Sequence, residues 1–272
     1  MTAGPGDPPV AYLDHAATSP VRPEVAEALQ PFAAGLFGNA SGSHRLARRA
    51  REALEDARDE VADVLGCAPA EVVFTSGGTE ADNLAVQGVL RAAAGGGPAA
   101  ATVVCSAVEH AAVLEPCRAL ARAAGRHAGP PVVLRETPVD GDGAVDPAGL
   151  AEVLDPGVVL VSVMLANNEV GTVQPMARVA EAVRRHAPSA VLHTDAVQAA
   201  PWADVGREAA GADLVSVSAH KLGGPKGAGA LVVRAGTLLA PLLYGGGQEQ
   251  ERRSGTHDVA GAVGLAVALR AA

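Results

Sequence analysis

The stretch Ser218-Ala219-His220-Lys221-Leu222-Gly223-Gly224-Pro225-Lys226-Gly227 places a lysine between an apolar segment and a glycine-rich turn. The apolar residues of 213–218 predict a buried strand directly before it. Lysine side chains are usually kept at the solvated surface. An amine at the end of a buried strand is instead well placed to attach covalently to an aldehyde cofactor. The alternative, an exposed lysine in a loop, is more common for a single lysine.

The composition is that of an acidic protein with few aromatic side chains. The 272 residues carry a formal net charge of -9, and aromatic residues make up 2%. Such a surface is unsuited to binding nucleic acid or anionic membranes. No apolar run approaches the ~20 residues of a membrane helix, and the N-terminus lacks the features of a signal peptide. We therefore expect a cytoplasmic protein without a membrane partner.

The three cysteines, Cys67, Cys105 and Cys117, have neither an even count nor a paired spacing. A disulfide framework or a cysteine-rich metal site is therefore not expected. Their positions predict a helix-end residue, a buried strand residue and a helix-core residue, in that order.

Predicted strands and helices alternate along the chain. The strand segments are near-continuous apolar runs, typical of strands buried on both faces of a mainly parallel sheet. The fold class is therefore α/β with three layers. Pro31 is expected to bend or end the first helix, and Ser43 to cap the second. We expect strands at 71–75, 102–105, 132–135, 158–164, 190–193, 213–218 and 230–234, helices at 23–29, 43–65, 79–93, 110–124 and 176–186, a short helix from 146, and a break at 95–98.

The segment Thr75-Ser76-Gly77-Gly78-Thr79-Glu80 joins a predicted strand to a predicted helix. Its glycines let a ligand approach the backbone closely, and a helix N-terminus offers unpaired N–H groups. The segment is therefore a candidate phosphate-binding turn. The alternative is an ordinary capping turn in which Thr79 satisfies the helix end.

A carboxylate follows another apolar strand, in His193-Thr194-Asp195-Ala196-Val197-Gln198. Asp195 is placed to keep a pyridine nitrogen protonated, which is how a protein makes pyridoxal 5'-phosphate (PLP) an electron sink. The alternatives are an Asp turn, or a metal pair formed by His193 and Asp195. Metal binding is the weaker of these because no second set of ligands has matching spacing.

Two further polar groups follow predicted strands. His110 begins a helix and could stack on a planar cofactor and move protons, although such histidines are more often only polar end residues. The amides of Asn167 and Asn168 could donate hydrogen bonds to a cofactor hydroxyl or simply form a turn. Ligands of open parallel sheets bind at the carboxyl ends of the strands. Together, these groups indicate a PLP site.

These segments resemble the cysteine desulfurases, in the NifS/IscS-like branch of the class V aminotransferase fold group. The resemblance runs in the family's order from about Tyr12 to the end of the chain. It implies the large domain of a PLP transferase of fold type I. The segments that carry it are Tyr12-Leu13-Asp14-His15-Ala16-Ala17-Thr18, residues 75–80, Glu109-His110, Asn167-Asn168-Glu169-Val170-Gly171, residues 193–198, residues 218–221, Gly245-Gly246-Gly247-Gln248-Glu249 and Arg252-Arg253-Ser254-Gly255-Thr256.

The resemblance implies a role for each residue near the cofactor ring. Lys221 would carry PLP covalently and remove the Cα proton of the substrate. Asp195 would pair with the pyridine nitrogen, and His110 would stack on the ring. Asn168 and Gln198 would contact the ring hydroxyl region.

The resemblance also implies how the phosphate is held. Gly78, Thr79, Ser218 and His220 would bind the phosphate of their own subunit. The threonine matching Thr256 would reach the phosphate of a partner subunit, so a homodimer is implied.

The implied reaction converts L-cysteine to L-alanine and leaves a persulfide for iron–sulfur cluster or thio-cofactor synthesis. The implied partners are a sulfur acceptor or iron–sulfur scaffold protein. No nucleic acid is expected as a partner, and the one link to RNA would be through relay proteins of tRNA thiolation. One alternative is an aminotransferase or selenocysteine lyase on the same scaffold. Another is a non-catalytic relative that binds a partner protein.

The sequence departs from the family pattern in its C-terminal part. The family's catalytic cysteine and its carboxylate-binding arginine lie beyond residue 272, and none of the three cysteines matches the catalytic position. We therefore expect a fragment that binds PLP weakly and does not desulfurate cysteine. The expected division is an N-terminal leader and small-domain segment at 1–16, a large PLP-binding domain at 17–256 and, at 257–272, the start of the helix leading into an absent small domain. That helix is expected to expose its apolar face.

Overall fold

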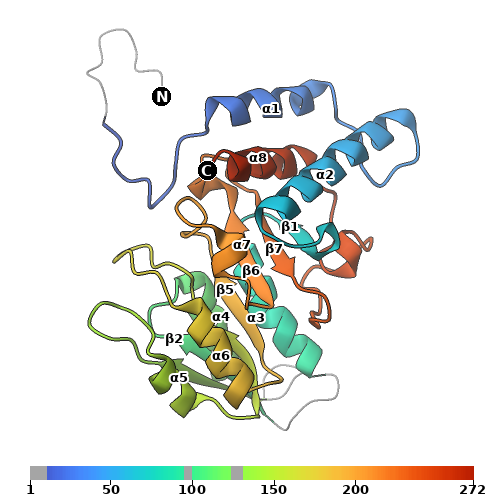
Figure 1. Ribbon diagram of the computed structural model, residues 1–272. Coiled ribbons are helices and arrows are strands. Elements are labelled where there is room, and N and C mark those ends of the chain that lie inside the picture. The colour runs from blue at the N-terminus through green and yellow to red at the C-terminus, as the bar shows by residue number, and fades with distance from the viewer. Residues whose placement is uncertain (1–10, 95–99, 124–130) are drawn as a thin grey trace.

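The computed structural model describes residues 11–94, 100–123 and 131–272 (Figure 1). The expected break at 95–98 and most of the leader lie outside these ranges. The helices are α1 (Pro23–Ala34), α2 (Arg45–Val64), α3 (Gly78–Ala93), α4 (Ala111–Arg122), α5 (Pro147–Val153), α6 (Met176–His186), α7 (Val205–Glu208) and α8 (Val259–Arg270), with short 3-10 turns η1 (Pro69–Glu71), η2 (Ala219–Lys221) and η3 (Glu249–Glu251). The strands are β1 (Val72–Thr75), β2 (Ala101–Ser106), β3 (Val132–Thr137), β4 (Val158–Ser162), β5 (Val191–Asp195), β6 (Leu214–Ser218) and β7 (Gly229–Val233).

All of these strands form one sheet, in the order β1-β7-β6-β5-β4-β2-β3. The pairs among β2 to β6 are parallel, whereas β7 runs antiparallel to both of its neighbours. The mainly parallel sheet expected from the apolar runs is therefore confirmed. The carboxyl ends of the parallel strands meet at one edge, where ligands of such sheets bind.

Helices cover both faces of the sheet, which gives the three expected layers (Figure 1). Alternate residues of one strand enter different cores, because successive side chains of a strand point to opposite faces. Val73 belongs to the core that contains side chains of α3 and α4, whereas its neighbour Val72 belongs to the core that contains those of α2 and α8. No helix within the described ranges is long and apolar enough to cross a membrane.

Two expectations about helix ends are wrong. The first helix does not end near Leu29 but continues through Pro31 to Ala34. Pro31 is exposed, so water can satisfy the carbonyl that its missing N–H leaves free. The second helix is capped by His44 rather than Ser43, and its Nδ1 accepts a hydrogen bond from the N–H of Ala47 at 3.3 Å.

The last helix is buried, contrary to the expectation that its apolar face is exposed. α8 lies against α1 and α2 (Figure 1), and Leu265 and Leu269 belong to the main core. Small residues allow this close packing. A Cβ added at Gly264 would lie 2.7 Å from Pro225 and 3.1 Å from Leu29. α1 and α2 therefore remove from solvent the face that would otherwise favour aggregation.

Candidate active site

Nine of the ten predicted site residues line one pocket at the carboxyl ends of the parallel strands. The pocket has a volume of about 590 Å³, within the about 300–1,000 Å³ of small-molecule sites. The tenth residue, Thr256, lies outside it. The nine residues are Gly78, Thr79, His110, Asn168, Asp195, Gln198, Ser218, His220 and Lys221.

Lys221 presents its amine to this pocket from the turn η2, directly after β6. Its Nζ donates hydrogen bonds to the carbonyl oxygens of Ala16 and Ala17. Burial lowers the pKa of Lys221, and the negative charges of Asp195 and Asp14 oppose that shift. The amine is therefore held in place without a carboxylate partner that would fix it as an ammonium.

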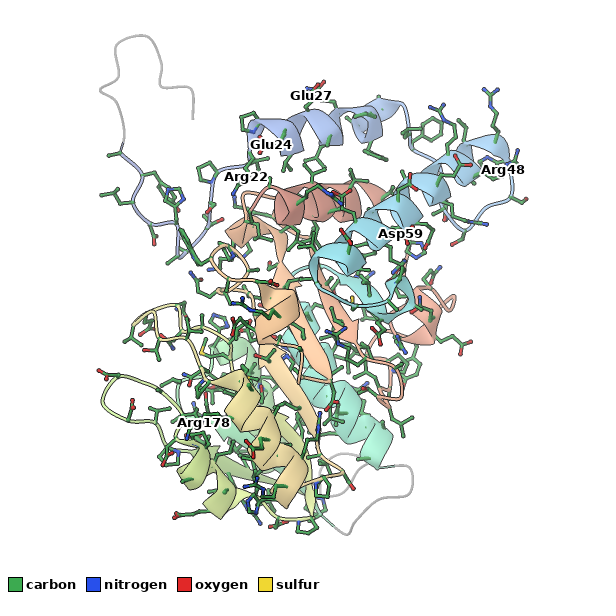
Figure 2. The ribbon with its side chains drawn as sticks, viewed as in Figure 1. Arg22, Glu24, Glu27, Arg48, Asp59 and Arg178 are labelled. Carbon is green, nitrogen blue, oxygen red and sulfur yellow. The ribbon has the colours of Figure 1, made fainter. Side chains whose placement is uncertain are left out.

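The N-terminal segment that holds Lys221 is itself fixed to the turn around it. Ser19 donates its N–H to the carbonyl of His220 at 2.9 Å, and the Thr18 hydroxyl lies 3.1 Å from Nδ1 of His220. Arg22, labelled in Figure 2, donates from Nε to the carbonyl of Leu222 at 2.8 Å. The sequence pattern marked this segment as part of the family resemblance but gave it no role.

The turn before α3 has the geometry of an anion-binding site. Gly77 has φ 137°, in the region that favours glycine, and no side chain caps the helix. A Cβ added at Gly78 would lie 2.6 Å from Val197. Glu80 instead accepts from the N–H of Ser76 at 2.8 Å and from Nε of Arg253 at 2.7 Å. The alternative in which Thr79 caps the helix is therefore wrong.

Two residues of one strand, Asp195 and His193, have different surroundings. Asp195 lines the pocket, and its Oδ1 also accepts from the N–H of Val197 at 2.8 Å, so an Asp turn is present as well. His193 is fully buried between the hydroxyls of Ser162 at 2.8 Å and Ser216 at 3.0 Å. Burial lowers the pKa of His193 to about 4. It is a neutral core histidine rather than a pocket residue.

Of the two asparagines, one forms a turn and the other lines the pocket, whereas His110 both caps a helix and lines the pocket. Asn167 forms the turn, because its Oδ1 accepts from the N–H groups of Glu169 and Val170 at 2.8 and 3.0 Å. Asn168 lines the pocket. His110 both caps α4, accepting from the N–H of Ala112 at 3.1 Å, and lines the pocket.

Comparison with known proteins agrees with this geometry. Residues 11–272 match the family model of aminotransferase class-V. The chain belongs to the class V aminotransferase family. It is 42% identical, over 96% of its length, to the cysteine desulfurase IscS of Dictyoglomus turgidum, and 43% identical, over 97%, to the IscS-like cysteine desulfurase of Mycobacterium tuberculosis. It spans 63% and 65% of the length of these two relatives.

Solved structures show the same fold. A NifS-like protein superposes with a TM-score of 0.86 at 37% identity, covering 94% of this chain and 67% of that one. A structure described as SspA in complex with cysteine superposes with a TM-score of 0.86 at 35% identity, covering 96% of this chain and 72% of that one.

Class V aminotransferases are PLP-dependent enzymes, and the pocket fits this cofactor. The Gln198 side chain has a buried Oε1 with no hydrogen-bond partner among the described residues, so a polar ligand group would satisfy it. The uncapped turn at Gly77 and Gly78 leaves room and N–H groups for a phosphate. Lys221 supplies an amine for an aldehyde, and Asp195 a carboxylate for a ring nitrogen.

Two buried carboxyls near Asp195 have no counterpart among the predicted site residues. Glu109 accepts from the N–H of Met164 and from the hydroxyl of Ser106, at 2.6 and 2.7 Å. Asp82 lies on α3 with Oδ1 3.5 Å from Nε2 of His193. Burial raises the pKa of Asp82 to about 7 and that of Glu109 to about 8. The available signal for Asp82 was a carboxylate between Ala81 and the apolar positions of α3 that follow it.

Asp82→Asn is expected to stabilise the cofactor-free chain above pH 7, by on the order of 4 kcal/mol. Burial raises the pKa of Asp82 from 3.8 to about 7, so the folded chain binds more protons than the unfolded chain between these values. Wild-type stability therefore falls as the pH rises through this window, and the variant lacks that loss. Urea unfolding from pH 4 to 8 measures the difference.

The matched control is Asp59→Asn, on an exposed position of α2 (Figure 2). It removes one carboxylate from the surface and so controls for the loss of a negative charge. A difference between Asp82→Asn and wild type that is constant from pH 4 to 8 would show that Asp82 stays ionised throughout.

Thr256 lies next to the active site but opens onto a second, smaller cavity of about 110 Å³. Ser76 and Gly227 line both cavities. A residue that contacts the phosphate of a partner subunit has to lie outside the pocket of its own subunit, as Thr256 does. The contact with the partner subunit stays a prediction.

The segment before Thr256 is held by a buried ion pair that sequence reasoning missed. Arg58 donates from both terminal nitrogens to Glu249, at 2.9 Å each. Glu249 also accepts from the N–H of Phe74 at 2.8 Å and lies 3.1 Å from Nε2 of His257. Burial alone would raise the pKa of Glu249, but Arg58 and His257 lower it to about 2.

These contacts stabilise an unusual backbone. Glu249, Gln250 and Glu251 have φ values of 49°, 53° and 66°, where residues other than glycine are strained. Such strain persists only where surrounding contacts outweigh it. The Arg58–Glu249 pair supplies those contacts at η3.

Proposed function

We propose that this chain forms the cofactor-binding part of a PLP-dependent cysteine desulfurase, which converts L-cysteine to L-alanine and passes on the sulfur. The observation that carries the proposal is the convergence of the Lys221 amine, the Asp195 carboxylate and the phosphate-binding turn on one pocket. Its relatives named cysteine desulfurase, and the neighbour solved in complex with cysteine, support the choice of substrate.

When bound, PLP supplies an electron sink for carbanion chemistry at the substrate Cα. Lys221 would hold the cofactor and would move a proton at that carbon. Asp195 would keep the ring nitrogen protonated, and His110 would stack on the ring. The buried walls around Asp195 exclude water, which strengthens these electrostatic interactions.

The thiol that accepts the sulfur is not one of the three cysteines of the chain. None of them lines the pocket within the described residues, and Cys105 and Cys117 are fully buried. Burial raises the pKa of Cys67 to about 11, so it is not a thiolate at neutral pH. We propose that another part of the protein, or a partner, supplies the thiol.

We further propose that the protein works in the cytoplasm as a homodimer and delivers sulfur to an acceptor or iron–sulfur scaffold protein. Thr256, beside the Ser76 turn but outside its own pocket, supports the dimer. Its sequence segment matches the family segment that crosses to a partner subunit.

Spectral titration of the PLP-loaded chain with amino acids tests the proposal. L-Cysteine is expected to change the visible absorbance of the bound cofactor, and L-serine, which differs by one atom, to change it less. Alanine is then measured in the same samples. A spectrum that responds to an amino donor such as L-glutamate but not to L-cysteine would favour an aminotransferase. Alanine turnover by the 272-residue chain would contradict the proposal that its thiol comes from elsewhere.

A further inference from the structure

Lys226 is a second cation of the active-site pocket, with no role so far. The chain has only two lysines, Lys221 and Lys226, among its 21 lysine and arginine residues. Both line the pocket. Lys226 is exposed, and in the described part of the chain it makes no hydrogen bond or ion pair. A free charge facing a ligand site is available to a ligand.

Lys226 lies in a loop that runs next to the phosphate-binding turn at residues 75–80. Its neighbour Gly227 lines both cavities together with Ser76. Gly229, at the start of β7, approaches Gly77 closely. A Cβ added at Gly229 would lie 2.7 Å from the Cα of Gly77. The loop that carries Lys226 therefore runs beside the turn before α3.

Lys226 also affects the protonation of His220, which lines the same pocket. Burial lowers the pKa of His220, and the positive charges of Lys221 and Lys226 lower it further. His220 is therefore neutral at neutral pH. Lys226 and His220 line the same pocket.

The other groups at this end do not balance the charge of a phosphate. Thr79, Ser218 and neutral His220 can donate hydrogen bonds but carry no charge. Arg253 is paired with Glu80 at 2.7 Å. Lys221 is required at the aldehyde. Among the described residues of the pocket, Lys226 is the cation left for a dianionic phosphate.

We propose that Lys226 binds the cofactor phosphate and supplies the positive charge at that end of the pocket. This inference rests on the proposed PLP-dependent function. It distinguishes the two lysines: Lys221 recognises the aldehyde, and Lys226 recognises the phosphate. Because charge is the requirement, arginine can replace Lys226 whereas an uncharged amide cannot.

The test compares PLP with pyridoxal, which has the same ring and aldehyde but no phosphate. Binding of both to the cofactor-free chain is measured for wild type, Lys226→Gln and Lys226→Arg. Lys226→Gln is expected to weaken PLP binding about tenfold, the effect of one charged hydrogen bond, and to leave pyridoxal binding unchanged. Lys226→Arg should retain most of the PLP affinity. Equal melting temperatures show that the variants fold.

Inorganic phosphate provides a probe that does not depend on the aldehyde chemistry. Lys226→Gln should weaken its binding, measured by 31P NMR, whether or not PLP attaches to Lys221. Equal losses for PLP and pyridoxal, or no loss for PLP and phosphate, would overturn the proposal. A weaker response to L-cysteine at unchanged PLP affinity would instead assign Lys226 to the substrate carboxylate. The two proposals can fail separately. If the wild type binds phosphate but does not attach PLP covalently, the proposed function is overturned, whereas the phosphate-binding role of Lys226 is retained.

Discussion

Lys221→Ala is expected to abolish covalent attachment of PLP to the chain. The attachment needs a primary amine at the pocket, and alanine removes the amine without adding bulk. Among the described residues, the Lys221 amine donates only to the carbonyls of Ala16 and Ala17, so the variant should still fold. Borohydride reduction of the PLP-treated protein, followed by mass spectrometry, should find the cofactor on Lys221 in wild type and no stable adduct in the variant.

Lys226→Arg is the matched control for this experiment. It leaves Lys221 as the only lysine of the chain and should retain one adduct per chain. An adduct on Lys226 in wild type, or undiminished labelling of Lys221→Ala at its N-terminus, would show that the pocket does not direct the aldehyde to Lys221. That result would also remove the main support for a PLP-dependent function.

Glu249→Gln is expected to lower the free energy of unfolding at pH 7 by roughly 3–5 kcal/mol, because it leaves the two terminal nitrogens of a buried arginine without their anion. Glu55, the other anion beside Arg58, pairs with Nε. Arg58 is 4% exposed and Glu249 5%, so water cannot replace the lost charge. The strained residues of η3 lose their main support as well. Urea unfolding measures the loss. Glu181→Gln, which breaks an exposed pair with Arg185 on α6, should cost under ~0.5 kcal/mol.

The effect of Glu249→Gln should depend on pH in a defined direction. Arg58 and His257 lower the pKa of Glu249 from 4.5 to about 2, so the folded chain binds fewer protons than the unfolded chain between these values. The stabilisation is complete above pH 4.5 and is lost as the pH falls toward 2. The difference between wild type and variant should therefore shrink across this window. A difference that stays constant down to pH 2 would contradict the assignment.

Most of the sheet and most of the pocket could be predicted from the sequence. Apolar runs located each described strand. A strand buried on both faces needs apolar side chains at successive positions, and this holds for all of them except the partly exposed edge strand β3. Polar residues directly after those runs located the pocket, because the carboxyl ends of parallel strands share one edge. Residues such as Lys221, Asp195 and Gly78 follow from these two rules alone.

The sequence could not show which member of each polar pair enters the pocket. Asp195 lines it, whereas His193, two residues earlier on the same strand, is enclosed by Ser162 and Ser216. Asn168 lines it, whereas Asn167 closes a turn. The depth of a side chain is set by packing from other strands and helices, and no local pattern records that packing.

Lys221 itself illustrates the division. The sequence determined that a lysine follows a buried strand and precedes a glycine-rich turn, because strand propensity and turn chemistry are local properties. Only the tertiary structure decided what meets its amine. The carbonyls of Ala16 and Ala17 come from the start of the chain, and Asp82 lines the same pocket from the N-terminal part of α3. Such contacts join residues far apart in sequence, and the packing of whole elements determines them.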